Sequence, residues 1–219
     1  MTHDQTDNHL LEIRVASEEI CKGNFLHVLR DIVKLPSGQL ATREYVVHPG
    51  AVVVVALLDD GRVVLERQYR YPVGQVMIEF PAGKLETGED PLLCGQRELL
   101  EETGYRASHW AYAGLMHLAI AYSTEVIHVY FAKGLSLGVR NLDEGEFLDV
   151  ISATPAELLL WCGQGAVTDA KTLTCTLWLQ NVLSKAWSLD WINVPEPIAT
   201  PSPTPTPTAT ATAEPPLAG

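Results

Sequence analysis

The stretch Pro81–Tyr105, PAGKLETGEDPLLCGQRELLEETGY, places a glycine turn directly before a group of carboxylates. Asp90 is suited to cap a helix, and Pro91 is suited to its first position. Gly104 is a natural C-terminal stop, so the sequence predicts a helix from Pro91 to Thr103. The carboxylates of this helix need an explanation, because crowded like charges oppose folding.

Three glutamates lie on one side of this helix, because Glu101 and Glu102 follow Glu98 by three and four residues. Like charges at such spacing destabilise a helix by about 0.2–0.5 kcal/mol per pair. Glu101 and Glu102 also lie near the helix C-terminus, where the helix dipole disfavours anions. A bound divalent cation would explain the arrangement, since Mg²⁺ prefers carboxylate, water and phosphate oxygens. The alternative is a solvated acidic face, in which Arg97 pairs with one of the glutamates.

The spacing of the fixed residues is more specific than the charges alone. Gly83 is followed after five residues by Glu89 and after seven more by Arg97-Glu98-Leu99-x-Glu101-Glu102-x-Gly104-Tyr105. This 23-residue pattern resembles the Nudix box at every fixed position. The resemblance extends over roughly residues 23–185 and implies an α/β fold, a Nudix α/β/α sandwich with a mixed β-sheet after N-terminal antiparallel strands. It also implies metal-dependent hydrolysis of a nucleoside diphosphate linked to another moiety.

The flanking sequences resemble the ADP-ribose pyrophosphatase branch of that family. They are REYVVHPGAVVVVALL from Arg43, RVVLERQYRYPVGQVMIEFPAG from Arg62 and LDEGEFLDVISATPAELL from Leu142. The resemblance implies hydrolysis of ADP-ribose or a related nucleoside diphosphate sugar to AMP and a sugar phosphate, with Mg²⁺ or Mn²⁺. One departure is Ile120 at the place of a usual proline, with Ala121 in place of glycine, which leaves the exact sugar open.

Site residues follow from matching this sequence to the family pattern. The resemblance implies that Gly83 lets the backbone turn sharply, so that the Ala82 carbonyl faces the metal. The expected metal ligands are Ala82, Glu98, Glu102 and Glu146, the expected catalytic residues are Glu144 (the base) and Glu101, and the expected substrate-binding residues are Arg43, Arg70 and Glu79. The alternatives are a solvated acidic loop, surface arginines and a structural Glu79. We expect a surface role for Glu125, with a place at the site as the alternative, and packing or edge positions for His48, His117 and His128.

Other functions remain open at this point. Another nucleotide-linked substrate, such as a GDP-sugar, NADH or a dinucleoside polyphosphate, would use the same box. A non-catalytic nucleotide-sensing module is less favoured, because the box carboxylates are all present. A scaffold acting through the C-terminal Pro/Thr segment is a third possibility.

The composition of the chain indicates which partners and which cell compartment to expect. The chain has 219 residues and a formal net charge of −12, which argues against nucleic acid and favours a small ligand that brings cations. No apolar stretch reaches the ~18 residues that span a bilayer, so we expect no membrane partner. The cysteines are widely spaced and suggest reduced thiols in the cytoplasm, namely Cys21, Cys94, Cys162 and Cys175.

The family resemblance, together with the Pro/Thr-rich composition of the C-terminal segment, implies a division of the chain into residues 1–46, 47–192 and 193–219. The first part contains three expected strands, at 11–21, 24–35 and 40–48, with a hairpin turn at Pro36–Gly38. By family resemblance this part packs between subunits of a homodimer. The second part is the expected Nudix domain, and the third is an expected disordered Pro/Thr-rich tail.

Within the expected Nudix domain, AVVVVALL at 51–58 reads as a strand buried on both faces. The turn Asp59–Gly61 is expected to join it to residues 62–70 as a second hairpin. Two later strands are expected within 110–118 and 125–133. A capping box of Thr154 and Glu157 predicts one helix, and a second is predicted within 168–187.

Overall fold

The computed structural model describes residues 5–142 and 144–195. The elements are η1 (Gln5–Leu10), β1 (Ile13–Lys22), β2 (His27–Lys34), β3 (Leu40–Val46), β4 (Ala51–Ala56), β5 (Val63–Arg70), η2 (Tyr71–Val73), β6 (Gln75–Glu79), β7 (Ala82–Lys84), α1 (Pro91–Thr103), β8 (Tyr105–His117), β9 (Val126–Leu137), β10 (Leu148–Ala153), α2 (Pro155–Gly163), α3 (Ala170–Leu183) and β11 (Trp191–Asn193). Within these described residues, no helix is long and apolar enough to cross a membrane.

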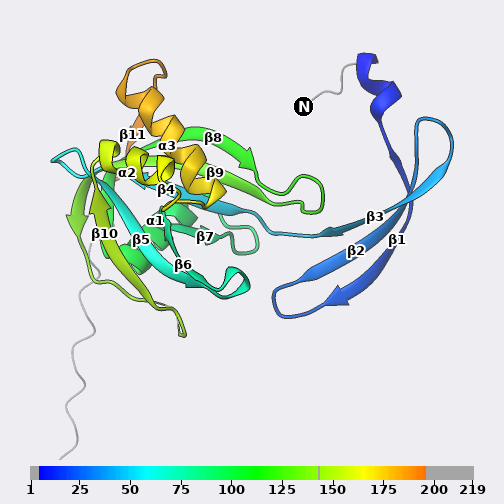
Figure 1. Cartoon of the computed structure of the whole chain (residues 1–219), viewed down its shortest axis with the longest axis horizontal. Coiled ribbons are helices and arrows are strands. Elements are labelled where there is room, and N and C mark those ends of the chain that lie inside the picture. Colours follow the sequence, from blue (N-terminus) through cyan, green and yellow to red (C-terminus); the bar gives the residue numbers. More distant parts are fainter. Residues whose placement is uncertain (1–4, 143, 196–219) are drawn as a thin grey trace, which may run out of the picture.

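A five-stranded mixed sheet in the order β11-β8-β9-β4-β7 forms the centre of the molecule. Strands β4 and β9 run parallel, and the other neighbours are antiparallel. Alternate residues of β4 face opposite sides, so Val52 and Val54 pack with the α1 residue Leu99, while Val53 and Val55 pack with α2 and α3. Figure 1 shows these helices on the two faces of the sheet. The predicted α/β/α sandwich and the doubly buried strand are confirmed.

Helix α1 has the predicted bounds because both of its ends are fixed locally. The Asp90 side chain accepts hydrogen bonds from the amides of Leu92 and Leu93, and Gly104 ends the helix in a left-handed conformation with φ of 76°. In the middle of the helix, a Cβ on Gly95 would lie 3.2 Å from Val52 Cγ1. A glycine at this position therefore lets the acidic helix lie close against the sheet.

The second predicted hairpin is wrong beyond its turn. The Leu58 amide donates to the Arg62 carbonyl at 2.9 Å, and a single bridge joins Leu57 to Val63. Strand β5 then leaves β4 and pairs with β6 and β10 in a separate three-stranded sheet. The physical reason is that both edges of β4 are already occupied, by β9 and β7.

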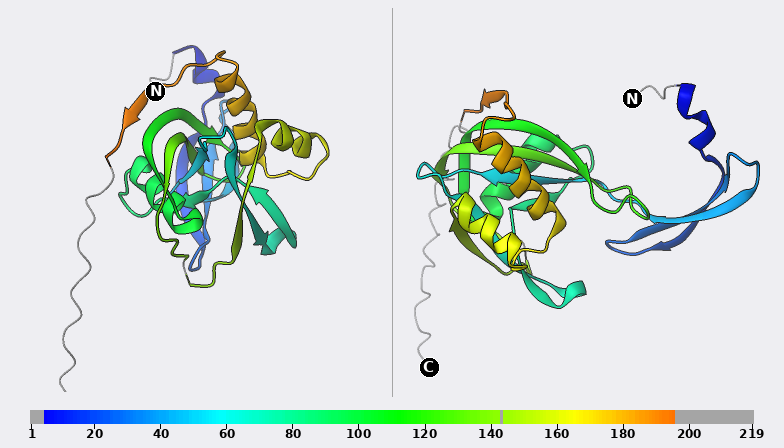
Figure 2. Two further views of the ribbon diagram at one scale, coloured as in Figure 1. Left: turned by 90° about the vertical axis from the view of Figure 1, so that its left-hand side faces the viewer. Right: turned by 45° about the horizontal axis from the view of Figure 1, so that its top comes forward.

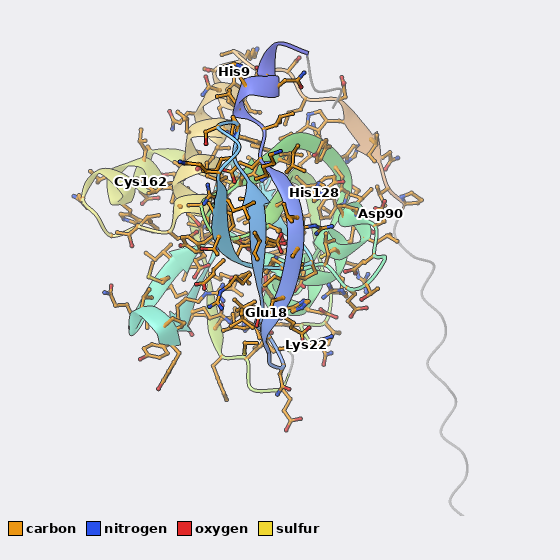
Figure 3. All side chains as sticks on the ribbon, turned by 90° about the vertical axis from the view of Figure 1, so that its right-hand side faces the viewer. His9, Glu18, Lys22, Asp90, His128 and Cys162 are labelled. Carbon is orange, nitrogen blue, oxygen red and sulfur yellow. The ribbon has the colours of Figure 1, made fainter. Side chains whose placement is uncertain are left out.

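Strands β1, β2 and β3 form an antiparallel sheet that projects away from the sandwich (Figure 2). The predicted turn before β3 closes with the Leu35 amide donating to the Gln39 carbonyl at 2.8 Å. Near the sandwich, the Val46 amide donates to the Tyr122 carbonyl at 2.8 Å, which ties β3 to the β8–β9 loop. All of β1 is exposed, and Figure 3 shows Glu18 and Lys22 along this strand in front of the sandwich.

The C-terminal part of the described chain returns to the central sheet. Strand β11 includes Asn193, and the amide of Val194 donates to the Ser108 carbonyl at 2.8 Å. The expected tail starts at residue 193, and its residues 196–219 lie outside the described part of the chain.

Candidate active site

A pocket of about 740 Å³ opens between α1, β5, β7 and the start of α3. Its charged lining residues are Arg70, Lys84, Glu86, Arg97, Glu98, Glu102, Glu125, Glu146, Asp169 and Lys171. Such a concave, polar site near several element ends is a typical place for a charged small ligand.

The acidic face of α1 contributes Glu98 and Glu102 to this pocket. Glu102 is only 4% exposed, and its Oε2 accepts a hydrogen bond from the Ala82 amide at 3.0 Å. Burial raises the pKa of Glu102 well above its usual value, and the charges of Glu66 and Glu98 add to this rise. Burial also raises the pKa of Glu98, although Arg97 opposes the shift. Their ionised forms therefore need further positive charge in the pocket.

Gly83 is required beside these carboxylates for a steric reason. It lies within β7, and a Cβ built on it would collide with the Glu98 carboxylate. The expectation of a sharp turn at Gly83 is therefore corrected, because its φ lies outside the left-handed region that favours glycine. A residue without a side chain allows Glu98 to reach the floor of the pocket.

Arg97 forms hydrogen bonds with three glutamates of the 23-residue pattern and so fixes their positions. Its Nη1 donates to Glu98 at 2.8 Å and to Glu101 at 3.1 Å, while Nε donates to Glu89 at 3.0 Å. The hydrogen bonds from Arg97 are the main cause that holds the pKa of Glu89 at about 2. Glu101 is not part of the pocket lining, so the structure places it behind Glu98 as a partner of Arg97.

One face of β5 supplies Glu66, Gln68 and Arg70, which alternate along the strand. Glu66 is completely buried, and neither of its carboxylate oxygens receives a hydrogen bond within the described residues. Burial and the charge of Glu79 raise the pKa of Glu66 to about 8. Sequence reasoning missed Glu66 and Gln68, although polar residues alternating through LERQYR were the available signal.

Arg70 lines the pocket, but Glu79 lies behind it. The guanidinium donates Nε to Glu79 Oε1 at 2.8 Å and Nη2 to Oε2 at 2.9 Å. Burial raises the pKa of Glu79, but Arg70 and Lys171 outweigh it and lower the pKa overall. Glu79 is 2% exposed and absent from the pocket lining, so the expectation that it faces a ligand is corrected.

The remaining expected residues divide between the pocket and its surroundings. Glu146 is half-buried in the pocket wall, whereas Glu144 lies exposed in the same loop, outside the lining. Arg43 lies on β3, where it donates to Glu12 and to the Thr42 carbonyl. The structure therefore does not bring Arg43 to the pocket of its own chain.

Two residues expected elsewhere do line the pocket, His48 and Glu125. His48 Nδ1 accepts a hydrogen bond from the Gly50 amide at 3.1 Å, which leaves Nε2 as the protonated nitrogen. That nitrogen lies 3.7 Å from Glu125 Oε1. The ring of Phe25 packs edge-on against His48. The expected surface role of Glu125 is thus corrected, because the β8–β9 loop folds back toward β4.

The oxygen donors of the pocket fit a hard divalent cation. Within the described residues, no three Asp, Glu, His or Cys side chains converge as a self-contained metal site. Mg²⁺ does not need one, because it commonly uses one or two carboxylates and completes its shell with water and substrate phosphate. Glu98, Glu102 and Glu146 supply such carboxylates, and a bound cation would favour the ionised forms of the two helix residues, whose pKa values burial raises.

Known proteins resemble most of the chain, including its N-terminal strands. The NUDIX domain model matches residues 47–173, and the model of the nucleoside diphosphate sugar hydrolase N-terminal domain matches residues 12–46. The ADP-ribose pyrophosphatase of Bacillus subtilis is 38% identical over 173 residues, which cover 78% of this chain and 94% of that protein. The methanol dehydrogenase activator of Bacillus methanolicus is 40% identical over 171 residues, covering 77% and 92%.

Similarity extends to a mammalian relative and to a solved structure. The ADP-sugar pyrophosphatase of Mus musculus is 30% identical over 214 residues, covering 87% of this chain and 98% of that protein. A solved ADP compounds hydrolase superposes with a TM-score of 0.73 at 19% identity, over 81% of this chain and 97% of that one, and shares the fold. With the box residues gathered around one pocket and a domain match of this extent, the chain belongs to the Nudix family.

Proposed function

We propose that this protein hydrolyses the diphosphate of ADP-ribose, or of a related nucleoside diphosphate sugar, to AMP and a sugar phosphate. Two relatives named ADP-ribose pyrophosphatase and ADP-sugar pyrophosphatase support this substrate class. The observation that carries the proposal is one pocket that joins the carboxylates of α1 to the guanidinium of Arg70. Carboxylates alone would repel a diphosphate, so the arrangement makes sense for a ligand that binds together with cations.

The proposed metal is Mg²⁺, with Mn²⁺ as the alternative. The Ala82 carbonyl, Glu98, Glu102 and Glu146 would hold it. When bound, such an ion neutralises the diphosphate and stabilises the charge that develops as a P–O bond breaks. In this proposal Glu101 contributes indirectly. It fixes the position of Arg97, and Arg97 in turn fixes Glu98.

The protein's own groups would perform the remaining steps. Glu144 would take a proton from the water whose oxygen attacks phosphorus, while the bond from phosphorus to the leaving phosphate breaks. The exposure of Glu144 in the loop that carries Glu146 supports this assignment, because water reaches it freely. Arg70 would donate to phosphate oxygens from the part of its guanidinium that Glu79 does not occupy.

We further propose a homodimer in which residues 1–46 form the dimerisation subdomain and residues 47–192 form the hydrolase domain. Strand β1 exposes Ile13 and Val15 at 64% and 58%, and an uncovered apolar sheet face of this kind marks an interaction site. Arg43 lies on the same sheet, outside its own pocket. A second copy packed on this sheet would allow Arg43 to complete the partner's site.

The cytoplasm is the proposed compartment. All cysteines are free thiols in the structure, and Cys94 and Cys175 are buried, where they act as small apolar side chains. The partners are then a small nucleotide sugar and a second copy of the chain.

Changing Glu102 to Gln tests the role of the α1 carboxylates. We expect Glu102→Gln to lower turnover of ADP-ribose by at least about a hundredfold, because an electrostatic contribution to the transition state is lost. The measurement is release of phosphate-monoester products, such as AMP or GMP, from a panel of ADP-ribose, a GDP-sugar, NADH and a dinucleoside polyphosphate, with Mg²⁺ and with a chelator. Asp59→Asn, which neutralises an exposed acid in the β4–β5 turn, is the control and should leave turnover unchanged.

Turnover by Glu102→Gln within tenfold of the wild type would refute the ligand role of this residue. Equal wild-type turnover in chelator would refute metal-dependent hydrolysis. A faster reaction with another panel member would replace ADP-ribose as the substrate.

The two loop acids should differ in what they change. We expect Glu144→Gln to lower kcat by about 10²–10⁴-fold, the usual contribution of a general base, without altering the Mg²⁺ concentration needed for half-maximal rate. Glu146→Gln should instead raise that Mg²⁺ concentration. Initial rates across a Mg²⁺ titration distinguish the two effects. The assignments would be reversed if Glu144→Gln shifted the metal requirement and Glu146→Gln did not.

The dimer is tested on the exposed face of β1. We expect the wild type to be a dimer at micromolar concentration, and Val15→Glu to be a monomer with greatly reduced activity, because a charge is placed on the apolar face. Size-exclusion chromatography with light scattering measures the mass, and Leu137→Glu, on an exposed part of β9, is the control. An active monomeric wild type would contradict the proposed dimer.

A further inference from the structure

A buried lysine stands in the pocket wall without a role in the proposed reaction. Lys171 is 8% exposed and lies in the first turn of α3, next to the acidic N-cap Asp169. Lysine is rarely buried unless it is paired, because removing its charge from water is costly. The side chains that Lys171 contacts therefore indicate its role.

Lys171 connects α3 to Glu79, the last residue of β6. Its Nζ donates to Glu79 Oε2 and, at 3.0 Å, to Asp169 Oδ2. A second link runs beside it, because the Phe80 amide donates to Thr172 Oγ1 at 3.2 Å. Asp169 Oδ2 also accepts from the Thr172 amide at 2.9 Å and so fixes the start of the helix. The lysine thus reaches Glu79 from a rigid element.

Glu79 in turn holds Arg70. Both carboxylate oxygens accept from the guanidinium, at 2.8 and 2.9 Å, and Oε2 is shared with Lys171. Glu79 is almost fully buried, and the buried Glu66 is its cross-strand partner on β5, so two buried carboxyl groups occupy paired positions here. Without Lys171, the half-exposed Arg70 would be the only cation bonded to Glu79 within the described residues. The Arg70 guanidinium would then be attracted toward the buried Glu79 and away from the pocket.

We propose that Lys171 is a positioning residue for the nucleotide diphosphate: it anchors the Glu79 carboxylate, and through it directs the free side of the Arg70 guanidinium into the pocket. The inference rests on the proposed function, because it assigns Arg70 to the diphosphate. Although Lys171 also lines the pocket, we assign its effect on the ligand to its contact with Glu79, so the effect of removing the lysine should depend on the glutamate being present.

A double-mutant cycle tests this dependence. The four proteins are the wild type, Lys171→Met, Glu79→Gln and the double variant, and Lys133→Met on the exposed part of β9 is the control for loss of a lysine. The measurements are kcat and KM for ADP-ribose with Mg²⁺, and the Kd of its non-hydrolysable α,β-methylene analogue by calorimetry. Circular dichroism confirms that each variant is folded.

We expect Lys171→Met to raise KM and the analogue Kd by about tenfold, the loss that corresponds to one charge-assisted hydrogen bond, with kcat within about threefold. Lys171→Arg should restore most of the affinity, since it keeps the charge. In the Glu79→Gln background, the lysine substitution should have little further effect. If Lys171→Met does not fold, Lys171→Gln takes its place in the cycle, because it keeps a hydrogen-bond donor.

Unchanged affinity in a folded Lys171 variant would overturn the proposal. Additive effects of the two substitutions would also overturn it, because they would mean that Lys171 acts independently of Glu79. A lower kcat with an unchanged Kd for the analogue would also overturn the proposal. These results differ from failure of the hydrolase proposal, which would show as a wild type that does not release a phosphate-monoester product from any substrate of the panel.

Discussion

The structure depends on how buried negative charge is balanced around helix α1. Glu98 and Glu102 are held in a pocket wall, and the buried Glu66 lies close enough for its charge to raise the pKa of Glu102 further. Arg97 compensates part of the acidic box through its hydrogen bonds to Glu89, Glu98 and Glu101. Arg70 and Lys171, which also line the pocket, provide further positive charge, and both oppose the rise in the pKa of Glu66. We propose that a divalent cation completes this balance and allows a diphosphate to bind where carboxylates alone would exclude it.

The fold brings these charges together from distant parts of the chain. Strand β4 fills the centre of the sandwich and lets α1 pack closely on one face, through Gly95. Strand β7 carries Gly83, which leaves room for the Glu98 carboxylate. The separate sheet of β5, β6 and β10 presents Arg70, while the capped start of α3 presents Lys171. Each charged group is thus carried by an element with its own packing or capping, which keeps the site rigid.

Local features of the sequence predicted the fold well. The bounds of α1 followed from Asp90 and Gly104, and the capping box of Thr154 and Glu157 is present at the start of α2. Contacts between distant parts of the chain were harder to predict. The turn after β4 was found, but its strands separate because other strands occupy the edges of β4. Sequence also could not show that Lys171 would contact Glu79, a residue 92 positions away, because no spacing rule links them. The same holds for Glu125, which a folded loop brings to His48.

Binding of a divalent cation by the α1 carboxylates can be measured without any substrate, by titration with Mn²⁺ followed by electron paramagnetic resonance. We expect the wild type to bind Mn²⁺, and the combined Glu98→Gln and Glu102→Gln variant to bind it at least about tenfold more weakly, since two hard oxygen ligands are lost. Equal Mn²⁺ affinity in the two folded proteins, or no binding by the wild type, would contradict cation binding by these carboxylates.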